Sequence, residues 1–258
     1  MLDKINGRNV NIAFIQFGCG GIGSWLAQFM GKFLHSICER YSVQQNLTMK
    51  YVIIDPDIVE NRNILRQNFL PFNVGDYKCN AISKIIVTPL IQDKLIFIME
   101  RIDTPAKITR LLESFIAGDE ETENIWIILG CVDNIKTRRA IYSAMKKVIK
   151  RDTKHDTFIY IDGGNEIDYG QVVTTVLTNS YWFPSVIRNW NNVSKKFPNI
   201  HKLFKENNEN ARDNVSCVFF GDQTMGINLK IAIEIFAIVQ RLLINSIIPE
   251  PLVRTIVL

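Results

Sequence analysis

Cysteine pairs and histidine clusters are missing from this sequence. Its five cysteines stand far apart, and none belongs to a CxxC pair of the kind that structural zinc sites use. An odd number of scattered cysteines also argues against a disulfide framework. The three histidines, His35, His155 and His201, show no metal-ligand spacing. We therefore expect most of the thiols to be small buried fillers.

Long apolar runs and blocks of like charge are also scarce. No stretch is apolar and long enough to span a bilayer, and the opening residues, MLDKINGRNV, lack a signal-peptide core. The net charge of +4 is spread along the chain and gives no case for a nucleic-acid partner. We therefore expect a cytoplasmic protein with neither a membrane nor a nucleic acid as partner.

The clearest pattern that is present spans residues 10–23, VNIAFIQFGCGGIG. An apolar run ends in glycines, and apolar residues then recur at helical spacing. This order predicts the strand, turn and helix that open a nucleotide-binding α/β domain, in which glycine lets the backbone approach a phosphate. Taken alone, the GxGxxG spacing fits a turn without ligand equally well. The candidate phosphate-binding glycines are Gly18, Gly20, Gly21 and Gly23.

The rest of the chain alternates strand and helix patterns. With 258 residues and 47% hydrophobic content, it can fill one α/β domain, residues 1–258. We expect a Rossmann-like three-layer fold, with a mainly parallel sheet flanked by helices. A helix near the C-terminus is apolar nearly all round, so we expect it to be buried, either in the core or against a second subunit. The acidic residues 119–124 indicate a solvated loop, and residues 179–216 a long, partly helical, lid-like insertion. Expected strands cover residues 50–54, 95–99, 125–129, 157–161, 170–178 and 253–258, and expected helices cover 81–86, 105–116, 136–151 and 222–244.

Carboxylates follow two of the expected strands. Asp55 and Asp57 end the second strand, where dinucleotide folds hold ribose hydroxyls, although an Asp-Pro pair also suits an ordinary turn. Asp133 follows the strand at 125–129. Ligands of open α/β sheets lie beyond the carboxyl ends of the strands, so we expect Asp133 near the nucleotide. By its local pattern, the polar segment 59–78 is a loop.

Together these motifs resemble those of the ThiF/MoeB superfamily, the adenylyltransferases that include the ubiquitin-activating enzymes. The resemblance covers most of the chain in order, and the features at 164–172 and 216–217 are most similar to PRTRC-type ThiF proteins. The matching motifs are the glycine loop, DxDxV at residues 55–59, NLxRQ at 63–67, DxGxxK at 73–78 with Asn for the first Asp, and DNxxTR at 133–138.

The resemblance implies a mechanism. Mg²⁺-ATP binds with its ribose on Asp55 and its phosphates near Asn63, Arg66 and Lys78, and Asp133 holds the metal. The C-terminal carboxylate of a ubiquitin-like or peptide partner then attacks the α-phosphate, which gives an acyl-adenylate and pyrophosphate. The family also implies a homodimer. The remaining candidate nucleotide-binding residues are Asp57, Gln67 and Asn134.

Two positions leave alternatives open. Cys217 stands where family members that carry a partner as a thioester have a cysteine, and it is either that nucleophile or a buried structural thiol. The family's N-terminal RYxRQ segment, which supplies an arginine to the neighbouring subunit's ATP, has no counterpart, and Arg8 is the only arginine before the glycine turn. Either Arg8 or another cation replaces it, or activity is weak.

Two other functions compete with adenylation. An NAD-dependent oxidoreductase fits the glycine turn and Asp55, but leaves the segment from Arg66 to Lys78 unexplained. A non-catalytic ThiF-like binding protein is the third interpretation. Singly, Arg66 and Lys78 suit surface salt bridges and Asp133 suits a helix cap, whereas their joint presence favours the adenylyltransferase.

Overall fold

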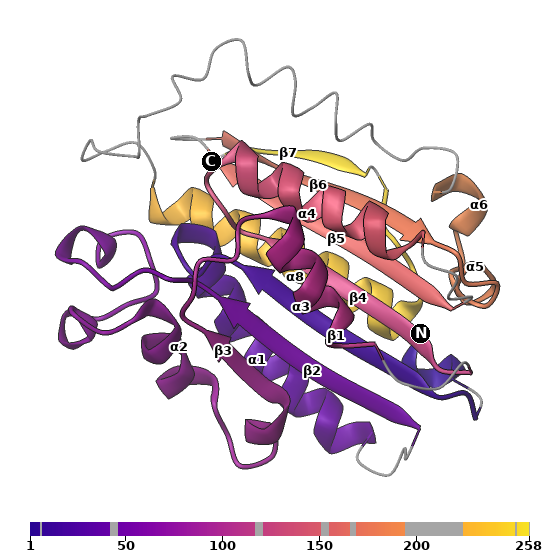
Figure 1. Ribbon diagram of the computed structural model, residues 1–258. Helices are drawn as coiled ribbons and strands as arrows, with labels where there is room; N and C mark the ends of the chain where they lie inside the picture. Colours follow the sequence, from indigo (N-terminus) through magenta and orange to yellow (C-terminus); the bar gives the residue numbers. More distant parts are fainter. Residues whose placement is uncertain are drawn as a thin grey trace.

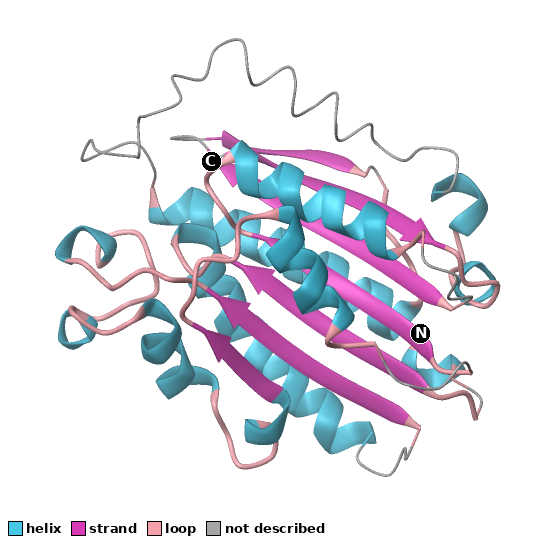
Figure 2. Cartoon of the chain, in the orientation of Figure 1, coloured by secondary structure: helices cyan, strands magenta, loops and turns pink. Residues whose placement is uncertain are grey.

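The computed structural model describes residues 1–5, 7–41, 46–116, 121–150, 155–165, 169–193, 224–250 and 252–257. These residues build a 7-stranded sheet with helices on both faces (Figures 1 and 2). None of the helices in these ranges is long and apolar enough to cross a membrane. In chain order the elements are η1 (Leu2–Lys4), β1 (Val10–Phe17), α1 (Gly21–Tyr41), β2 (Leu47–Ile54), η2 (Asn61–Asn63), η3 (Pro71–Asn73), α2 (Lys78–Ile86), η4 (Gln92–Lys94), β3 (Leu95–Ile98), α3 (Pro105–Glu113), β4 (Glu123–Gly130), α4 (Ile135–Val148), β5 (Asp156–Asn165), β6 (Tyr169–Thr178), α5 (Phe183–Val186), α6 (Trp190–Val193), α8 (Met225–Asn245) and β7 (Val253–Val257).

The sheet has the order β3-β2-β1-β4-β5-β6-β7. Strands β3, β2, β1, β4 and β5 run parallel, and β6 and β7 add on antiparallel. The predicted α/β fold, with its mainly parallel sheet flanked by helices, is confirmed. Because β1 lies between β2 and β4, the strand order reverses there, and this is where ligands of such folds bind.

Strand β1 shows how the sheet divides the core into two layers. Successive side chains of a strand point to opposite faces, so Ile12 and Phe14 pack with α1 and α8, whereas Ala13 and Ile15 pack with α3 and α4. Burial on both faces explains why most residues of the strand are apolar.

Helix α8 lies against the sheet beside α1 in Figure 1, as part of the same core. Ile231, Ile235 and Leu242 are fully buried, and the ring of Phe236 lies 5.6 Å from that of Phe29 on α1. The expectation of a buried late helix is therefore confirmed, and the surfaces that bury α8 belong to its own chain.

The predicted lid-like insertion is described only up to residue 193. In that part, Trp182 and Phe183 are buried and join the core, and two short helices, α5 and α6, follow one another. Cys217 and the remaining residues of the insertion lie outside the described part of the chain.

One expectation is wrong: the acidic connector does not end in a solvated loop. Glu123 and Asn124 are buried and begin β4. The Ser180 hydroxyl donates a hydrogen bond to the Glu123 carboxylate (2.7 Å), and Nδ1 of His155 lies 3.4 Å from its other oxygen. Burial raises the pKa of Glu123. Both partners are distant in sequence, so the local acidic pattern did not reveal that this carboxylate is buried.

The glycine turn between β1 and α1 places two backbones against each other. Gly18 has a φ of +95°, and a Cβ there would overlap the carbonyl oxygen of Cys131, which follows β4. A Cβ on Gly23, inside α1, would overlap the carbonyl oxygen of Gly18. Glycine is therefore required at both positions for the turn to close onto the end of β4.

We expect Gly18→Ala to lower the free energy of unfolding more than Gly75→Ala does. Gly75 has a φ of +94°, but nothing lies within 4 Å of a Cβ built there. Both alanines take on backbone strain of about 1–2 kcal/mol, and Gly18→Ala adds a further ~1–3 kcal/mol of steric overlap. Urea unfolding measures the difference, and equal losses in the two variants would contradict the close approach.

Candidate functional site

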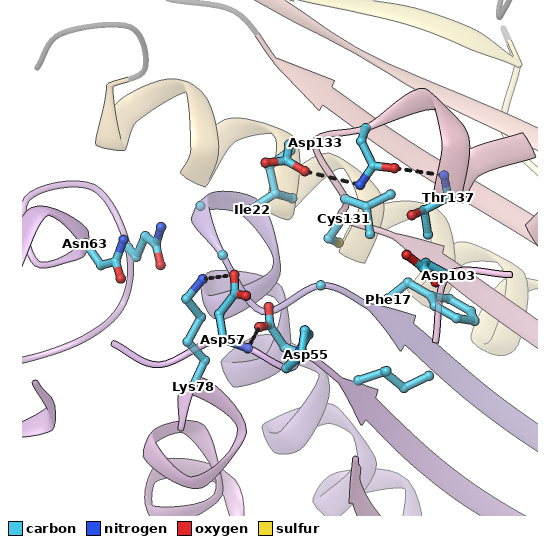
Figure 3. Close-up of a pocket in the computed structure, with 18 of the residues that line it drawn as sticks. Phe17, Ile22, Asp55, Asp57, Asn63, Lys78, Asp103, Cys131, Asp133 and Thr137 are labelled. Carbon is cyan, nitrogen blue, oxygen red and sulfur yellow. Dashed lines mark hydrogen bonds and ion pairs between the residues drawn. The ribbon is translucent and has the colours of Figure 1, made fainter. Parts of the chain in front are cut away.

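A cavity of about 360 Å³ opens at the carboxyl ends of β1, β2 and β4. Figure 3 shows Asn63 and Lys78 at one end, and Phe17, Asp103 and Thr137 toward the other. Of the predicted site residues, Gly23 lies inside α1 and is not part of the lining, and Cys217 lies outside the described residues. The predicted residues that line the cavity are Gly18, Gly20, Gly21, Asp55, Asp57, Asn63, Arg66, Gln67, Lys78, Asp133 and Asn134.

Asp55 anchors the glycine turn to the end of β2. Its carboxylate is almost fully buried and accepts hydrogen bonds from the backbone N–H of Cys19 (2.6 Å) and of Asp57 (2.8 Å). Burial raises the pKa of Asp55, and the charge of Lys78 and the two backbone donors oppose that rise. Each carboxylate oxygen of Asp55 can accept one more hydrogen bond in addition to the one from the backbone. The expected contact between Asp55 and the ribose therefore stays a prediction.

Lys78 brings a positive charge into the cavity wall. It is the first residue of α2 and is 7% exposed, and its Nζ lies 2.9 Å from a carboxylate oxygen of Asp57, as Figure 3 shows. Burial alone would lower the pKa of Lys78, but the charges of Asp55 and Asp57 outweigh it and raise the pKa. Lys78 therefore stays charged at neutral pH.

The segment between β2 and α2 forms the wall next to Lys78. The side-chain oxygen of Asn63 accepts from the backbone N–H of Glu60 (2.8 Å), and the Asn63 carbonyl accepts from the N–H groups of Arg66 and Gln67. This compact turn places Arg66 and Gln67 on the cavity. Gln67 is 7% exposed, and its buried side-chain oxygen has no hydrogen-bond partner among the described residues.

Asp133 and Asn134 have different roles: Asn134 caps α4, and Asp133 lines the cavity. The side-chain oxygen of Asn134 accepts from the backbone N–H of Thr137 (2.8 Å) and caps α4. The cap is therefore Asn134, and the exposed carboxylate of Asp133 is left at the mouth of the cavity (Figure 3). We also predicted that Asn134 contacts the nucleotide, and its side-chain oxygen is already engaged in this cap.

Asp133 fits the role of a magnesium ligand. In the described ranges, no three His, Cys, Asp or Glu side chains form a cluster that could hold a metal ion by themselves. Mg²⁺ is commonly held by one or two carboxylates together with substrate phosphates and water. The exposed carboxylate of Asp133, beside a cavity lined by lysine and arginine side chains, would meet that requirement once the phosphates of a nucleotide supply further oxygen ligands.

Arg138 holds the loop after β4 in place, a role that sequence reasoning missed. Its guanidinium donates to the carbonyl oxygens of Val132 (2.8 Å) and Gly163 (3.0 Å), and its Nε lies 3.2 Å from a carboxylate oxygen of Asp162. Burial raises the pKa of Asp162, and Arg138 opposes the rise. The arginine thus ties the loop that carries Asp133 to β5. Its place in the DNxxTR motif was the available signal.

Gln16, near the end of β1, holds the glycine turn through its side chain. Its side-chain NH₂ group donates to the carbonyl oxygens of Gly18 (2.9 Å) and Gly23 (3.0 Å), and its oxygen accepts from the hydroxyl of Tyr51 (2.6 Å). A polar residue between the apolar Ile15 and Phe17 was the sequence signal for this contact.

Arg8 lies away from the cavity of its own chain. It precedes β1, whose 8 residues span roughly 26 Å at about 3.3 Å per residue. Its guanidinium lies 6.0 Å from the ring centroid of Trp182. Arg62 and Arg101 do line the cavity, and Arg101 comes from the loop after β3, which local patterns did not connect to the site.

We expect Arg138→Lys to lower the free energy of unfolding by about 2–4 kcal/mol, because lysine cannot replace three contacts of a buried guanidinium. Arg110→Lys, at an exposed position of α3, serves as the control and should change stability by less than ~0.5 kcal/mol. Urea denaturation measures both. Equal stability of the two variants would show that the loop needs no such anchor.

Comparison with known proteins agrees with this geometry. The model of the ThiF family matches residues 8–219. No curated protein matches the sequence significantly.

Several solved structures share the fold. E. coli MccB with ATP has a TM-score of 0.53 and 18% identity, and the match covers 97% of this chain and 60% of that chain. The microcin C7 biosynthetic enzyme MccB in complex with N-formylated MccA gives the same four values: 0.53, 18%, 97% and 60%. For PaaA the TM-score is 0.53 and the identity 16%, with 95% of this chain and 60% of that chain covered. This chain thus spans about three fifths of the length of those proteins.

The family match covers most of the chain. The chain belongs to the ThiF family.

Proposed function

We propose that this protein is an ATP-dependent adenylyltransferase that activates the C-terminal carboxylate of a ubiquitin-like protein or peptide. The observation that carries this proposal is the convergence of Arg66, Lys78 and Asp133 on one cavity beyond the glycine turn. Membership of the ThiF family and the fold shared with MccB bound to ATP and to MccA add support.

The charges in the cavity suggest how ATP lies in it. The triphosphate occupies the end with Asn63, Arg66 and Lys78, and the ribose lies on Asp55. The backbone N–H groups at the start of α1 add a partial positive charge. Asp133 would hold Mg²⁺ together with the nucleotide, and the metal would supply positive charge that neutralises part of the phosphate charge.

In the proposed reaction, a carboxylate oxygen of the partner attacks the α-phosphorus. An oxygen–phosphorus bond forms, and the bond from the α-phosphorus to the bridging oxygen breaks. Pyrophosphate leaves with the electron pair, and an acyl-adenylate remains. Arg66 and Lys78 stabilise the charge that builds up on the phosphates, because they are already in place before the reaction.

Transfer of the acyl group to Cys217 is not part of this proposal, because that residue lies outside the described part of the chain. Assignment to the PRTRC type is likewise a proposal from sequence features alone, among them Gly164, Asn165 and Cys217.

We expect Lys78→Ala to weaken Mg²⁺-ATP binding and to lower partner-dependent ATP–pyrophosphate exchange roughly 100- to 1,000-fold. Lys84→Ala is the matched control on the same helix, because Lys84 is exposed and pairs with Asp76 (2.6 Å) outside the cavity. Asp133→Asn should also reduce exchange. Calorimetry measures ATP binding, a panel of ubiquitin-like proteins and peptides is used for exchange, and circular dichroism checks the fold.

Two outcomes of these measurements would overturn the proposal. In one, folded wild-type protein binds NAD but not Mg²⁺-ATP, which favours an oxidoreductase. In the other, Lys78→Ala and Asp133→Asn bind ATP as tightly as Lys84→Ala does, which removes the cavity from ATP binding.

We also propose that the protein forms a homodimer through the segment between β2 and α2. In Figure 1 this segment, with η2 and η3, projects from the body of the molecule. It combines cavity-lining residues with exposed apolar side chains, and a surface of this kind marks an interaction site. The exposed apolar residues of the segment are Ile58, Leu65, Leu70, Phe72, Val74 and Tyr77.

Phe72→Asp should therefore convert a dimer into a monomer, because it places a charge on the most exposed apolar side chain of this segment. Tyr181→Asp is the control, since Tyr181 is an equally exposed aromatic residue outside the segment (83% against 76% for Phe72). Sedimentation equilibrium measures the mass. A monomeric wild-type protein, or equal dissociation of both variants, would contradict this interface.

A further inference from the structure

Helix α8 carries one buried polar side chain that reaches the cavity wall. Asn228, in the first turn of α8, is fully buried. Its side-chain NH₂ group donates to the backbone carbonyl of Arg66 (3.2 Å), and its oxygen accepts from the side-chain NH₂ group of Asn165 (2.6 Å). Asn228 does not itself line the cavity, whereas both of its partners do.

The glycine turn accommodates this side chain. A Cβ on Gly21 would lie 2.7 Å from both the nitrogen and the oxygen of the Asn228 carboxamide, so a larger residue at position 21 would displace it. The carboxamide therefore packs against the start of α1 while it bonds to the segment after β2 and to the end of β5. Three parts of the cavity wall meet at this one group.

The backbone around Arg66 is held from a second side as well. The backbone N–H of Asn68 donates to the hydroxyl of Ser24 on α1 (2.9 Å). The Arg66 carbonyl accepts a hydrogen bond from α8, and the Asn68 amide donates one to α1. The turn that presents Arg66 to the cavity is thus fixed between two helices.

We propose that Asn228 is a positioning residue, which fixes the backbone of Arg66 so that the guanidinium meets the phosphates of the nucleotide. The statement about the nucleotide rests on the proposed function, whereas the statement about the Arg66 backbone does not. A carboxamide suits the position because it offers a donor and an acceptor at once. Aspartate keeps only the acceptor, and leucine keeps neither.

The first experiment measures amide hydrogen exchange in the nucleotide-free protein. We expect Asn228→Leu to speed exchange both in residues 63–69 and near residue 165. Asn228→Asp, which is nearly the same size, should speed exchange in residues 63–69 only, because it still accepts from Asn165. The control is Ile238→Val, a buried substitution on the same helix away from the cavity, which should change neither segment.

The second experiment tests the link to Arg66 through a double-mutant cycle. In an Asn228→Asp background we expect ATP to bind roughly tenfold more weakly, while adenosine, which lacks phosphates, binds as before. Arg66→Ala should weaken ATP binding in the wild-type background and have much less effect in the Asn228→Asp background, because the arginine is already misplaced there.

The proposal is overturned if residues 63–69 exchange as slowly in Asn228→Asp as in the wild type, or if Ile238→Val speeds them equally. Additive losses in the double-mutant cycle also overturn it. If the wild type binds neither ATP nor adenosine, the proposed function fails, and hydrogen exchange alone then decides the role of Asn228. Should Asn228→Leu not fold, Asn228→Asp carries both tests.

Discussion

The candidate site depends on the hydrogen bonds that the buried carboxylate of Asp55 accepts from two backbone N–H groups. The carboxylate holds the backbone of the glycine turn through Cys19 and the start of the next segment through Asp57. Its negative charge also helps to keep Lys78 protonated within a buried wall. Without it, the turn after β1, the end of β2 and the cation on α2 would lose their common anchor.

A buried charge pair fastens the loop on the other side of the cavity. Arg138 and Asp162 fasten the loop after β4 to β5, and the arginine also bonds two backbone carbonyls. Buried pairs pay a desolvation penalty and are weak evidence for stability. The value of the Arg138–Asp162 pair lies in geometry, because it fixes the loop after β4 close to where the strand order reverses.

Polar residues have different roles at the two ends of the parallel strands. At the carboxyl ends of the strands, charged side chains such as Lys78 and Asp133 line the cavity. At the opposite edge, Glu123 is enclosed by Ser180 and His155, and Arg8 lies over Trp182. These polar groups at the amino ends of the strands contact other parts of the protein. Glu123 and Arg8 thereby connect β4 and the residues before β1 to the segment after β6.

Patterns along the chain were enough to predict the strand–turn–helix unit, the mainly parallel sheet and about half of the residues that line the cavity. Hydrophobic periodicity is local, and parallel strands bring their carboxyl ends to one edge, so motifs after β2 and β4 had to meet. Three features became visible only in the folded chain: Glu123 is buried, Asn134 rather than Asp133 caps α4, and Asn228 bonds to the backbone of Arg66. That last contact joins residues 162 positions apart. Such contacts depend on how whole elements pack together, which leaves no periodic trace along the chain.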